Sequence, residues 1–165
     1  MGDVIYLFKG GFIMERGISI HDVANTLLSF EEMTNKKLQK LCFYAQAWHL
    51  ALFKEPLFKE RFEAWVHGPV CRELYSVYKN HGWNPIVEPE SGVCIKDGEI
   101  GEFLKIVHNT YGGFDGDELE ALTHSELPWQ EARKGFEEWE PSNEYISEEI
   151  MEEFYSNIYE QAQND

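Results

Sequence analysis

The sequence predicts a mainly α-helical fold with a minor β element, that is, a single compact helical domain with a small two- or three-stranded sheet. Several stretches repeat apolar residues at spacings of three and four, which is the period of an amphipathic helix. Within residues 19–165, only residues 62–66 and 93–95 have the bulky composition of short strands. A chain of 165 residues, 43% of them hydrophobic, is also the size of one domain with one core. We expect an N-terminal extension over residues 1–18 and one domain over residues 19–165.

The N-terminal extension contains a second methionine, Met14, which is a candidate alternative start of translation. Residues 4–8 are apolar enough to pack or to pair as a short strand, and Gly10-Gly11 then breaks that stretch. We assign no function to this segment.

Two helices are expected in the first third of the domain. Ser19 has the form of a helix N-cap, with Asp22 favoured near the positive helix end, and this helix should run to about Glu32. Thr34 is the next candidate cap. The helix that follows it should be the central core helix and should end before Pro56. Its apolar face consists of Leu38, Leu41, Cys42, Ala45, Trp48, His49 and Leu52.

A strand and a further helix are expected next. Residues 62–66 alternate partly and are bulky, which predicts a short strand that Gly68-Pro69 should end. Proline at the first helical position has the right fixed dihedral and needs no amide bond, so we expect a helix over residues 70–80. Residues 81–99 hold several glycines and prolines, which indicates an irregular connection, with residues 93–95 as a candidate second strand.

The C-terminal half returns to helical spacing. A helix is expected over residues 100–111, and Asp115, Pro128 and Ser147 each stand where a further helix should begin. The last of these helices should bury three apolar side chains and turn its glutamates outward. The three side chains are those of Ile150, Phe154 and Ile158.

The formal net charge of −16 is distributed unevenly. Residues 36–79 contain eight Lys or Arg against four Asp or Glu, whereas residues 131–165 contain two against eleven. Because phosphate backbones repel an acidic chain, direct nucleic-acid binding is disfavoured. The acidic tail is either a solvated helix face or a surface that competes for a basic site on a partner. An acidic DNA mimic is a third hypothesis, and it requires carboxylates spaced along one exposed face.

Several classes of protein are disfavoured by the absence of their patterns. No run approaches the roughly 20 apolar residues of a membrane span, and no signal peptide is recognisable, so we expect a cytoplasmic protein. Cys42, Cys71 and Cys94 are odd in number and widely spaced, which favours core packing over disulfides or zinc. The six histidines form no metal motif, and no dinucleotide or P-loop pattern occurs. We expect no cofactor and no metal.

Three blocks of sequence carry a family resemblance: KLQKLCFYAQAWH at residues 37–49, FEAWVHGPV at 62–70 and THSELPW at 123–129. In order and spacing they resemble the Panacea family, the SocA-like domain of bacterial and phage antitoxins, over roughly residues 19–135. The resemblance implies an antitoxin that neutralises a cognate protein toxin, encoded by an adjacent gene, through direct binding.

The same resemblance leaves other functions open. In one branch of the family the domain is an adaptor that delivers a toxin to a cytoplasmic protease, and some members belong to phages or mobile elements without a toxin partner. The chain has no separate protease-docking or DNA-binding domain, which does not favour the adaptor or an autorepressor.

The second block and the helix expected after it supply the first candidate partner-binding residues, Trp65, His67, Gly68, Pro69 and Tyr75. Trp65 and His67 would frame a groove, since tryptophan buries much area at low conformational cost, and Tyr75 would lie beside them. The structural alternative is that Gly68 and Pro69 turn the chain while the side chains fill the core. Five aromatic residues are more than a core of this size needs, so some of the five should lie at the surface. The five are Tyr75, Tyr78, Trp83, Tyr111 and Trp139.

The third block supplies His124, Glu126 and Trp129 as further candidate partner-binding residues. A histidine and a carboxylate together can do acid–base chemistry beside a nucleophile or a water, so a small hydrolase using His124 and Glu126 is the less favoured alternative. No serine or cysteine stands in a nucleophile-elbow pattern, and we expect no catalytic residue. The structural alternative is a helix junction in which Pro128 fixes the backbone while His124 and Trp129 pack.

Overall fold

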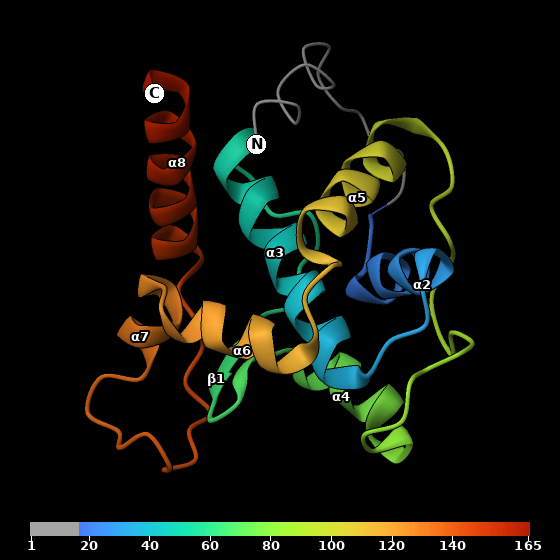
Figure 1. The fold of residues 1–165 in the computed structure, drawn as a ribbon, viewed down its shortest axis with the longest axis horizontal. Coiled ribbons are helices and arrows are strands. Elements are labelled where there is room, and N and C mark those ends of the chain that lie inside the picture. The colour runs from blue at the N-terminus through green and yellow to red at the C-terminus, as the bar shows by residue number, and fades with distance from the viewer. Residues whose placement is uncertain (1–16) are drawn as a thin grey trace.

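The computed structural model describes residues 17–165 and places one buried helix, α3, at the centre of the fold (Figure 1). Helices α2 and α5 cover one side of α3, and α8 covers the other. The elements are α2 (Ile20–Phe30), α3 (Asn35–Phe53), β1 (Glu63–Trp65), β2 (Gly68–Val70), α4 (Arg72–Tyr78), the 3₁₀ turn η1 (Lys79–His81), α5 (Gly98–Tyr111), α6 (Gly116–His124), α7 (Leu127–Ala132) and α8 (Glu148–Asn164). The prediction of a mainly helical fold with a small sheet is confirmed. The strand expected over residues 4–8 lies outside the described residues.

The first two helices begin at the predicted caps. The Ser19 hydroxyl accepts a hydrogen bond from the Asp22 amide, and the Asp22 carboxylate accepts one from the Ser19 amide, which forms a capping box. The Thr34 hydroxyl accepts from the Lys37 amide at 3.2 Å and starts α3. Helix α3 ends before Pro56, as predicted, with Lys54 in the left-handed region.

Helix α3 is buried on every side. All side chains over residues 38–51 are buried, including four that are polar. Gln46 shows how such a residue is accommodated, because its amide donates to the Phe58 carbonyl and accepts from the Leu57 amide. The polar residues of α3 thus fix neighbouring loops to the core, and Lys40, described below, is the exception.

Strands β1 and β2 form an antiparallel hairpin in which Trp65 pairs with Gly68 and Ala64 pairs with Pro69. The predicted helix start at Pro69 is therefore wrong, because α4 begins only at Arg72. Gly68 has a φ of 109°, which lets the chain reverse through a two-residue turn. The fixed φ of proline suits a strand at the edge of a sheet as well as a helix start, so the sequence pattern did not distinguish the two.

The segment that pairs with the other edge of β1 also differs from the expected one, which was residues 93–95. Residues 93–95 form no strand; instead the amides of Val93 and Ile95 donate to the side chains of Asp22 and Thr26 on α2. The backbone of residues 62–64 pairs with residues 144–146, through bonds of 2.8 Å from the Ala64 amide and from the Ile146 amide. The chain before α8 therefore ties the hairpin to the C-terminal part of the fold.

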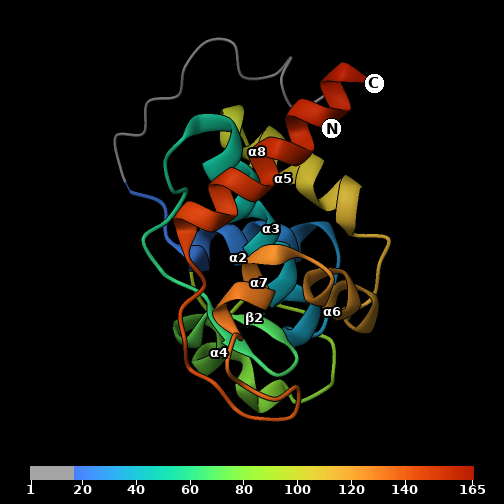
Figure 2. The ribbon, with the colours of Figure 1, turned by 90° about the vertical axis from the view of Figure 1, so that its left-hand side faces the viewer.

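Helix α8 lies across α3 (Figure 2). The Ser147 hydroxyl accepts from the Ile150 amide, which confirms the predicted cap. The buried side chains of α8 are Met151 and Tyr155, whereas Phe154 and Ile158 are only partly buried, so the inward face is turned slightly from the predicted one. Within residues 17–165, no helix combines the length and the apolar character that crossing a membrane requires.

Candidate functional site

A pocket of about 380 Å³ lies between the start of α3, the hairpin and the segment from α4 to Trp83. It is lined by Asn35, Lys36, Gln39, Lys40, Trp65, His67, Val70, Tyr75, Lys79, Gly82 and Trp83. Three lysines and one histidine contribute to this lining, and among the described residues no aspartate or glutamate does. The pocket is thus locally basic in a protein whose net charge is −16.

Three of the residues proposed from the sequence meet in this pocket. Trp65 and Tyr75 pack edge to face with ring centroids 5.0 Å apart, and His67 lies at the exposed tip of the hairpin. The Arg72 guanidinium also lies over the Trp65 ring, with Cζ 5.6 Å from the ring centroid. Because the indole is only half-buried, it keeps surface for a ligand or partner.

Trp65 also lines a second pocket. That pocket, of about 440 Å³, is lined by Trp65, Val66, His67, Val70, Arg72 and residues 141–143. The hairpin therefore contributes residues to two pockets, and Trp65 belongs to both. We regard Trp65 as the centre of the candidate site.

Gly68 and Pro69 act through the backbone, since both are buried and neither lines the pocket. A Cβ atom built on Gly68 would lie 2.7 Å from Cε and 3.2 Å from Nζ of Lys40. Glycine at this position therefore has two physical reasons: the positive φ of the turn and the close passage of the Lys40 side chain.

Lys40 is the residue of this site that the sequence analysis missed. Its side chain lines the pocket, yet it is only 1% exposed, and within residues 17–165 its Nζ makes no hydrogen bond or ion pair. Burial, together with the nearby charge of Lys36 and against the opposing effect of Glu120, lowers the pKa of Lys40 to about 7. The pocket is thus lined by a lysine whose amine is easily deprotonated and forms no ion pair within the described residues.

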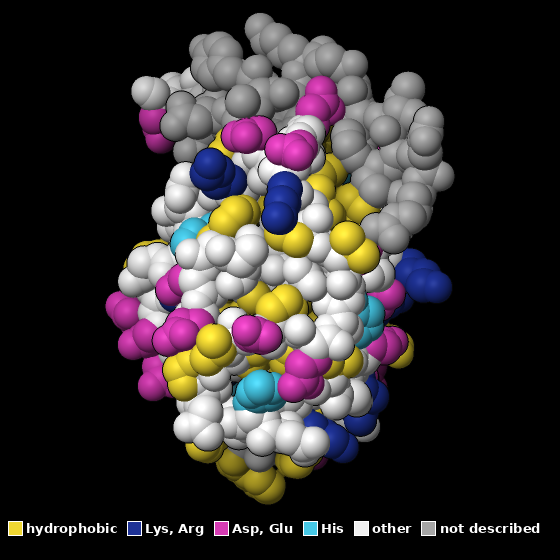
Figure 3. Space-filling view, turned by 90° about the vertical axis from the view of Figure 1, so that its right-hand side faces the viewer, with side chains coloured by type: hydrophobic (Ala, Val, Ile, Leu, Met, Phe, Trp, Pro, Cys, Tyr) yellow, Lys and Arg dark blue, Asp and Glu magenta, His cyan; other side chains and the backbone are white. Residues whose placement is uncertain are grey.

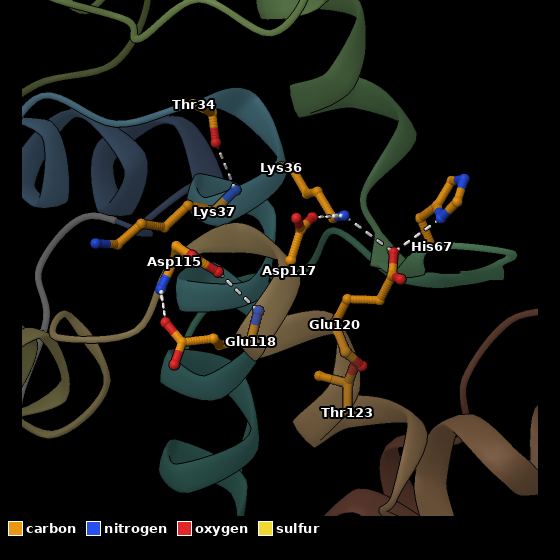
Figure 4. Close-up of polar contacts among 9 residues, drawn as sticks. All are labelled: Thr34, Lys36, Lys37, His67, Asp115, Asp117, Glu118, Glu120 and Thr123. Carbon is orange, nitrogen blue, oxygen red and sulfur yellow. Dashed lines mark hydrogen bonds and ion pairs between the residues drawn. The ribbon is translucent and has the colours of Figure 1, made fainter.

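The other lysine of the α3 start is fully paired (Figure 4). Lys36 Nζ lies 2.5 Å from Asp117 and 3.1 Å from Glu120, and Glu120 also accepts from His67 Nδ1 at 2.8 Å. Burial alone would raise the pKa of Glu120, but the bonds from Lys36 and His67 outweigh it and lower the pKa. This cluster joins α3, α6 and the hairpin tip, and within residues 17–165 it forms no ion pair with Lys40.

His124 and Trp129 form a packed pair behind the hairpin. Their rings stack with centroids 3.8 Å apart, and Trp129 Nε1 donates to the Trp65 carbonyl at 2.9 Å. Burial lowers the pKa of His124, and its buried Nε2 has no hydrogen-bond partner within the described residues. Pro128 lies in the first turn of α7, as predicted. The pair supports the backbone of β1 and lies outside the linings of both pockets.

Glu126 belongs to a different cluster. Its Oε1 accepts from the Tyr44 hydroxyl at 2.6 Å and from the Tyr155 hydroxyl at 2.9 Å, and burial raises its pKa. Glu126 therefore links α3 to α8 in the core. The structure gives His124 and Glu126 separate sets of contacts and does not bring them together in either pocket.

The aromatic residues divide between the core and the surface. Trp83 and Trp139 are 76% and 74% exposed, and Tyr75 is 37% exposed, whereas Tyr78 and Tyr111 are buried. Trp83 and Tyr75 line the pocket, and Trp139 does not.

Cys42 and Cys71 are buried free thiols. Over residues 17–165 no cluster of three or more His, Cys, Asp or Glu could hold a metal ion.

Comparison with known proteins gives one informative result. A family model described as "Antitoxin SocA-like, Panacea domain" matches residues 38–130, which include the hairpin, α4 to α6 and most of the pocket. No curated protein and no solved structure matches the chain.

Proposed function

Because more than half of its length matches the family, the chain belongs to the Panacea family of SocA-like antitoxin domains, and we propose that it neutralises a cognate toxin by binding it directly. The toxin is the protein product of an adjacent gene. Its contact surface on this chain is the pocket beside Trp65. Family membership favours such a binding role over catalysis, and so do the separate surroundings of His124 and Glu126.

The observation that carries this proposal is the group of accessible aromatic side chains around one basic pocket. Trp65 on β1, Tyr75 on α4 and Trp83 in the turn after η1 all line it. Aromatic side chains concentrate the energy of protein interfaces, especially where they flank a concavity that a partner's side chain can fill. In the space-filling view of Figure 3, hydrophobic side chains also gather at the lower end of the molecule, the end at which α4 and η1 lie in Figure 1.

The acidic face of α8 is a second contact in this proposal. Glu149, Glu153 and Glu160 are exposed on α8. A basic surface of the toxin would be attracted to these glutamates. The helix would then compete with the toxin's own anionic ligands for that basic surface. On the face drawn in Figure 3, acidic side chains lie in separate groups between hydrophobic and uncharged ones, so that face lacks the continuous row of carboxylates that a DNA mimic requires.

The test combines growth with co-purification. The adjacent open reading frame is induced with and without this protein, and the two products are then purified together. Rescue of growth together with a stable complex is the expected result. Rescue without a complex, and dependent on a host protease, would replace direct neutralisation by the adaptor function, whereas a harmless neighbour would reject the toxin assignment.

Two tryptophans allow a matched comparison for the proposed surface. Trp83→Ala removes an exposed ring at the pocket, and Trp139→Ala removes an equally exposed ring away from it. We expect Trp83→Ala to weaken toxin binding by about tenfold or more, the usual effect of a hot-spot aromatic residue, and Trp139→Ala to leave it unchanged. Equal effects of the two substitutions would show that the pocket is not the contact surface.

A further inference from the structure

We propose that Lys40 anchors a carboxylate-binding subsite, in which an acidic side chain of the partner protein enters the pocket and pairs with Lys40 Nζ at its floor. The residues beside that acidic side chain then pack on Trp65, Tyr75 and Trp83. The identity of the partner rests on the proposed function, but the chemistry of the subsite does not.

The first argument is the missing counter-ion. A buried charge is ordinarily paired, because removing an ammonium group from water costs several kcal/mol. The other lysines on the first turns of α3 obey this rule, since Lys36 pairs with Asp117 and Glu120, and Lys37 pairs with Glu31. Lys40 is more deeply buried than either, yet it has no such partner within residues 17–165. A partner that arrives with the ligand would resolve this exception.

The second argument is the position of the Lys40 side chain relative to the pocket. It passes Gly68, whose missing Cβ leaves room for Cε, and it reaches the lining of the pocket. A group inside the pocket can therefore meet the amine without rearrangement of α3. The pocket connects a buried cation to the surface.

The third argument selects the ligand's charge and class. The described lining contains Lys36, Lys79 and His67 besides Lys40, without an acidic side chain, so an anion is favoured. Among the lysines of the described lining, Lys36 is already paired and Lys40 is not. One carboxylate neutralises Lys40, whereas a phosphate dianion would leave an excess buried charge. Aromatic and aliphatic walls suit the rest of a protein side chain better than a polyphosphate.

The pairing should make binding depend on pH. The charged or titratable groups that face Lys40 are Lys36 on its own helix, Glu120 and His124 on α6, His67 at the hairpin tip and Lys79 on η1. Lys36 and Glu120 already neutralise each other, so the ligand's carboxylate mainly meets Lys40. Because burial lowers the pKa of Lys40 to about 7, binding a carboxylate at higher pH takes up a proton and becomes weaker as the pH rises.

The subsite can be tested without the toxin. In the full-length protein labelled with ¹³C at lysine Cε, sodium butyrate is the carboxylate probe, butanamide is its neutral isostere, and ATP tests the alternative class of nucleotides. We expect butyrate, and not butanamide, to shift the Lys40 Cε resonance saturably and to raise the midpoint of its pH titration. An unmoved Lys40 resonance, or stronger binding of ATP than of butyrate at Lys40, would overturn the proposal.

The partner experiment uses Lys40→Met and, as a control, Lys105→Met, which removes an exposed lysine on α5. Truncating one partner of a buried charge pair should weaken binding of the co-purified toxin by about 30-fold or more, whereas the control should bind like the wild type. Unchanged binding by Lys40→Met would overturn the subsite and leave the antitoxin function intact. If the wild-type protein binds no neighbouring product, the antitoxin function fails, and the butyrate titration alone decides the subsite.

Discussion

At the scale of single residues, Lys40 should reduce the stability of the free protein. Its amine is buried without a counter-ion, so replacing Lys40 by Met keeps the side-chain volume and removes the cost of burying a charge. We expect Lys40→Met to be more stable than the wild type by about 2–4 kcal/mol at pH 7. Chemical denaturation of both proteins measures the difference, and Lys105→Met should show little change.

The same residue predicts how stability changes with pH. The pKa of Lys40 is about 7 in the folded protein, whereas an unfolded lysine titrates near its ordinary value. Between these two values the unfolded state binds more protons, so the wild type gains stability as the pH rises, by at most about 1.4 kcal/mol per pH unit. Stability measured from pH 7 to pH 9 should therefore converge for the wild type and Lys40→Met. Parallel pH profiles would contradict the burial of this amine.

Gly68 carries a second prediction at this scale. An alanine there needs a positive φ and places Cβ 2.7 Å from Lys40 Cε, so we expect Gly68→Ala to destabilise the fold by about 1–3 kcal/mol. Gly113→Ala is the control, because Gly113 lacks a positive φ and a Cβ there meets nothing within 4 Å. Thermal unfolding of the two variants should separate them, and equal melting temperatures would show that the turn tolerates a side chain.

Among the site residues, Trp65, His67 and Tyr75 could be proposed from sequence because aromatic and histidine side chains next to a Gly-Pro turn are an unusual local combination. Lys40 could not be recognised in the same way. It stands among other lysines in a basic stretch, and lysines of an amphipathic helix normally face water. The signal that was available is that α3 is apolar around most of its circumference, which indicates a helix buried on all sides and therefore a buried lysine.

At the scale of elements, the helix starts with a side-chain cap were predictable, whereas the start of α4 and the hairpin before it were not. Ser19, Thr34 and Ser147 cap helices because the hydroxyl-to-amide geometry is local to three residues. The strand that pairs with residues 62–66 depends on where the chain runs next. Strand β2 is that partner, and it could not be recognised because Gly-Pro is typical of both a turn and a helix start. Likewise, the pairing with residues 144–146 joins positions too distant for any local pattern.

Helix α8 carries the prediction for the acidic tail. Deleting residues 147–165 would expose the core around Tyr155 and remove a hydrogen bond to Glu126, so deletion would unfold the domain rather than test its charge. The sharper variant is Glu149→Gln with Glu153→Gln and Glu160→Gln, all exposed. We expect an unchanged fold by circular dichroism, weaker toxin binding and a smaller dependence of binding on salt.

A control for that variant changes the same number of exposed carboxylates elsewhere: Glu88→Gln, Glu102→Gln and Glu138→Gln. Both variants alter the net charge by the same amount, so a general effect of charge would affect them equally. Only a contact between α8 and the toxin makes the first variant the weaker binder. Equal binding by the two variants would assign the tail to solvation alone.

At the scale of the whole molecule, the net charge of −16 and the ion pairs act in opposite directions when salt is added. Salt screens repulsion between the many unpaired carboxylates and so favours the compact state, but it also weakens pairs such as Lys36 with Asp117 and Glu120. Exposed pairs contribute only about 0–1 kcal/mol each, and in residues 17–165 only a minority of the carboxylates form ion pairs, so the repulsion should dominate. We expect the melting temperature to rise as NaCl increases from about 0.01 M to about 0.1 M, over which the Debye length falls from about 30 Å to about 10 Å.

The variant of α8 with three glutamines should show a shallower rise of the melting temperature because it has fewer charges to screen. A melting temperature that falls with salt would mean that the pair network joining α3, α6 and the hairpin outweighs the repulsion of the whole chain.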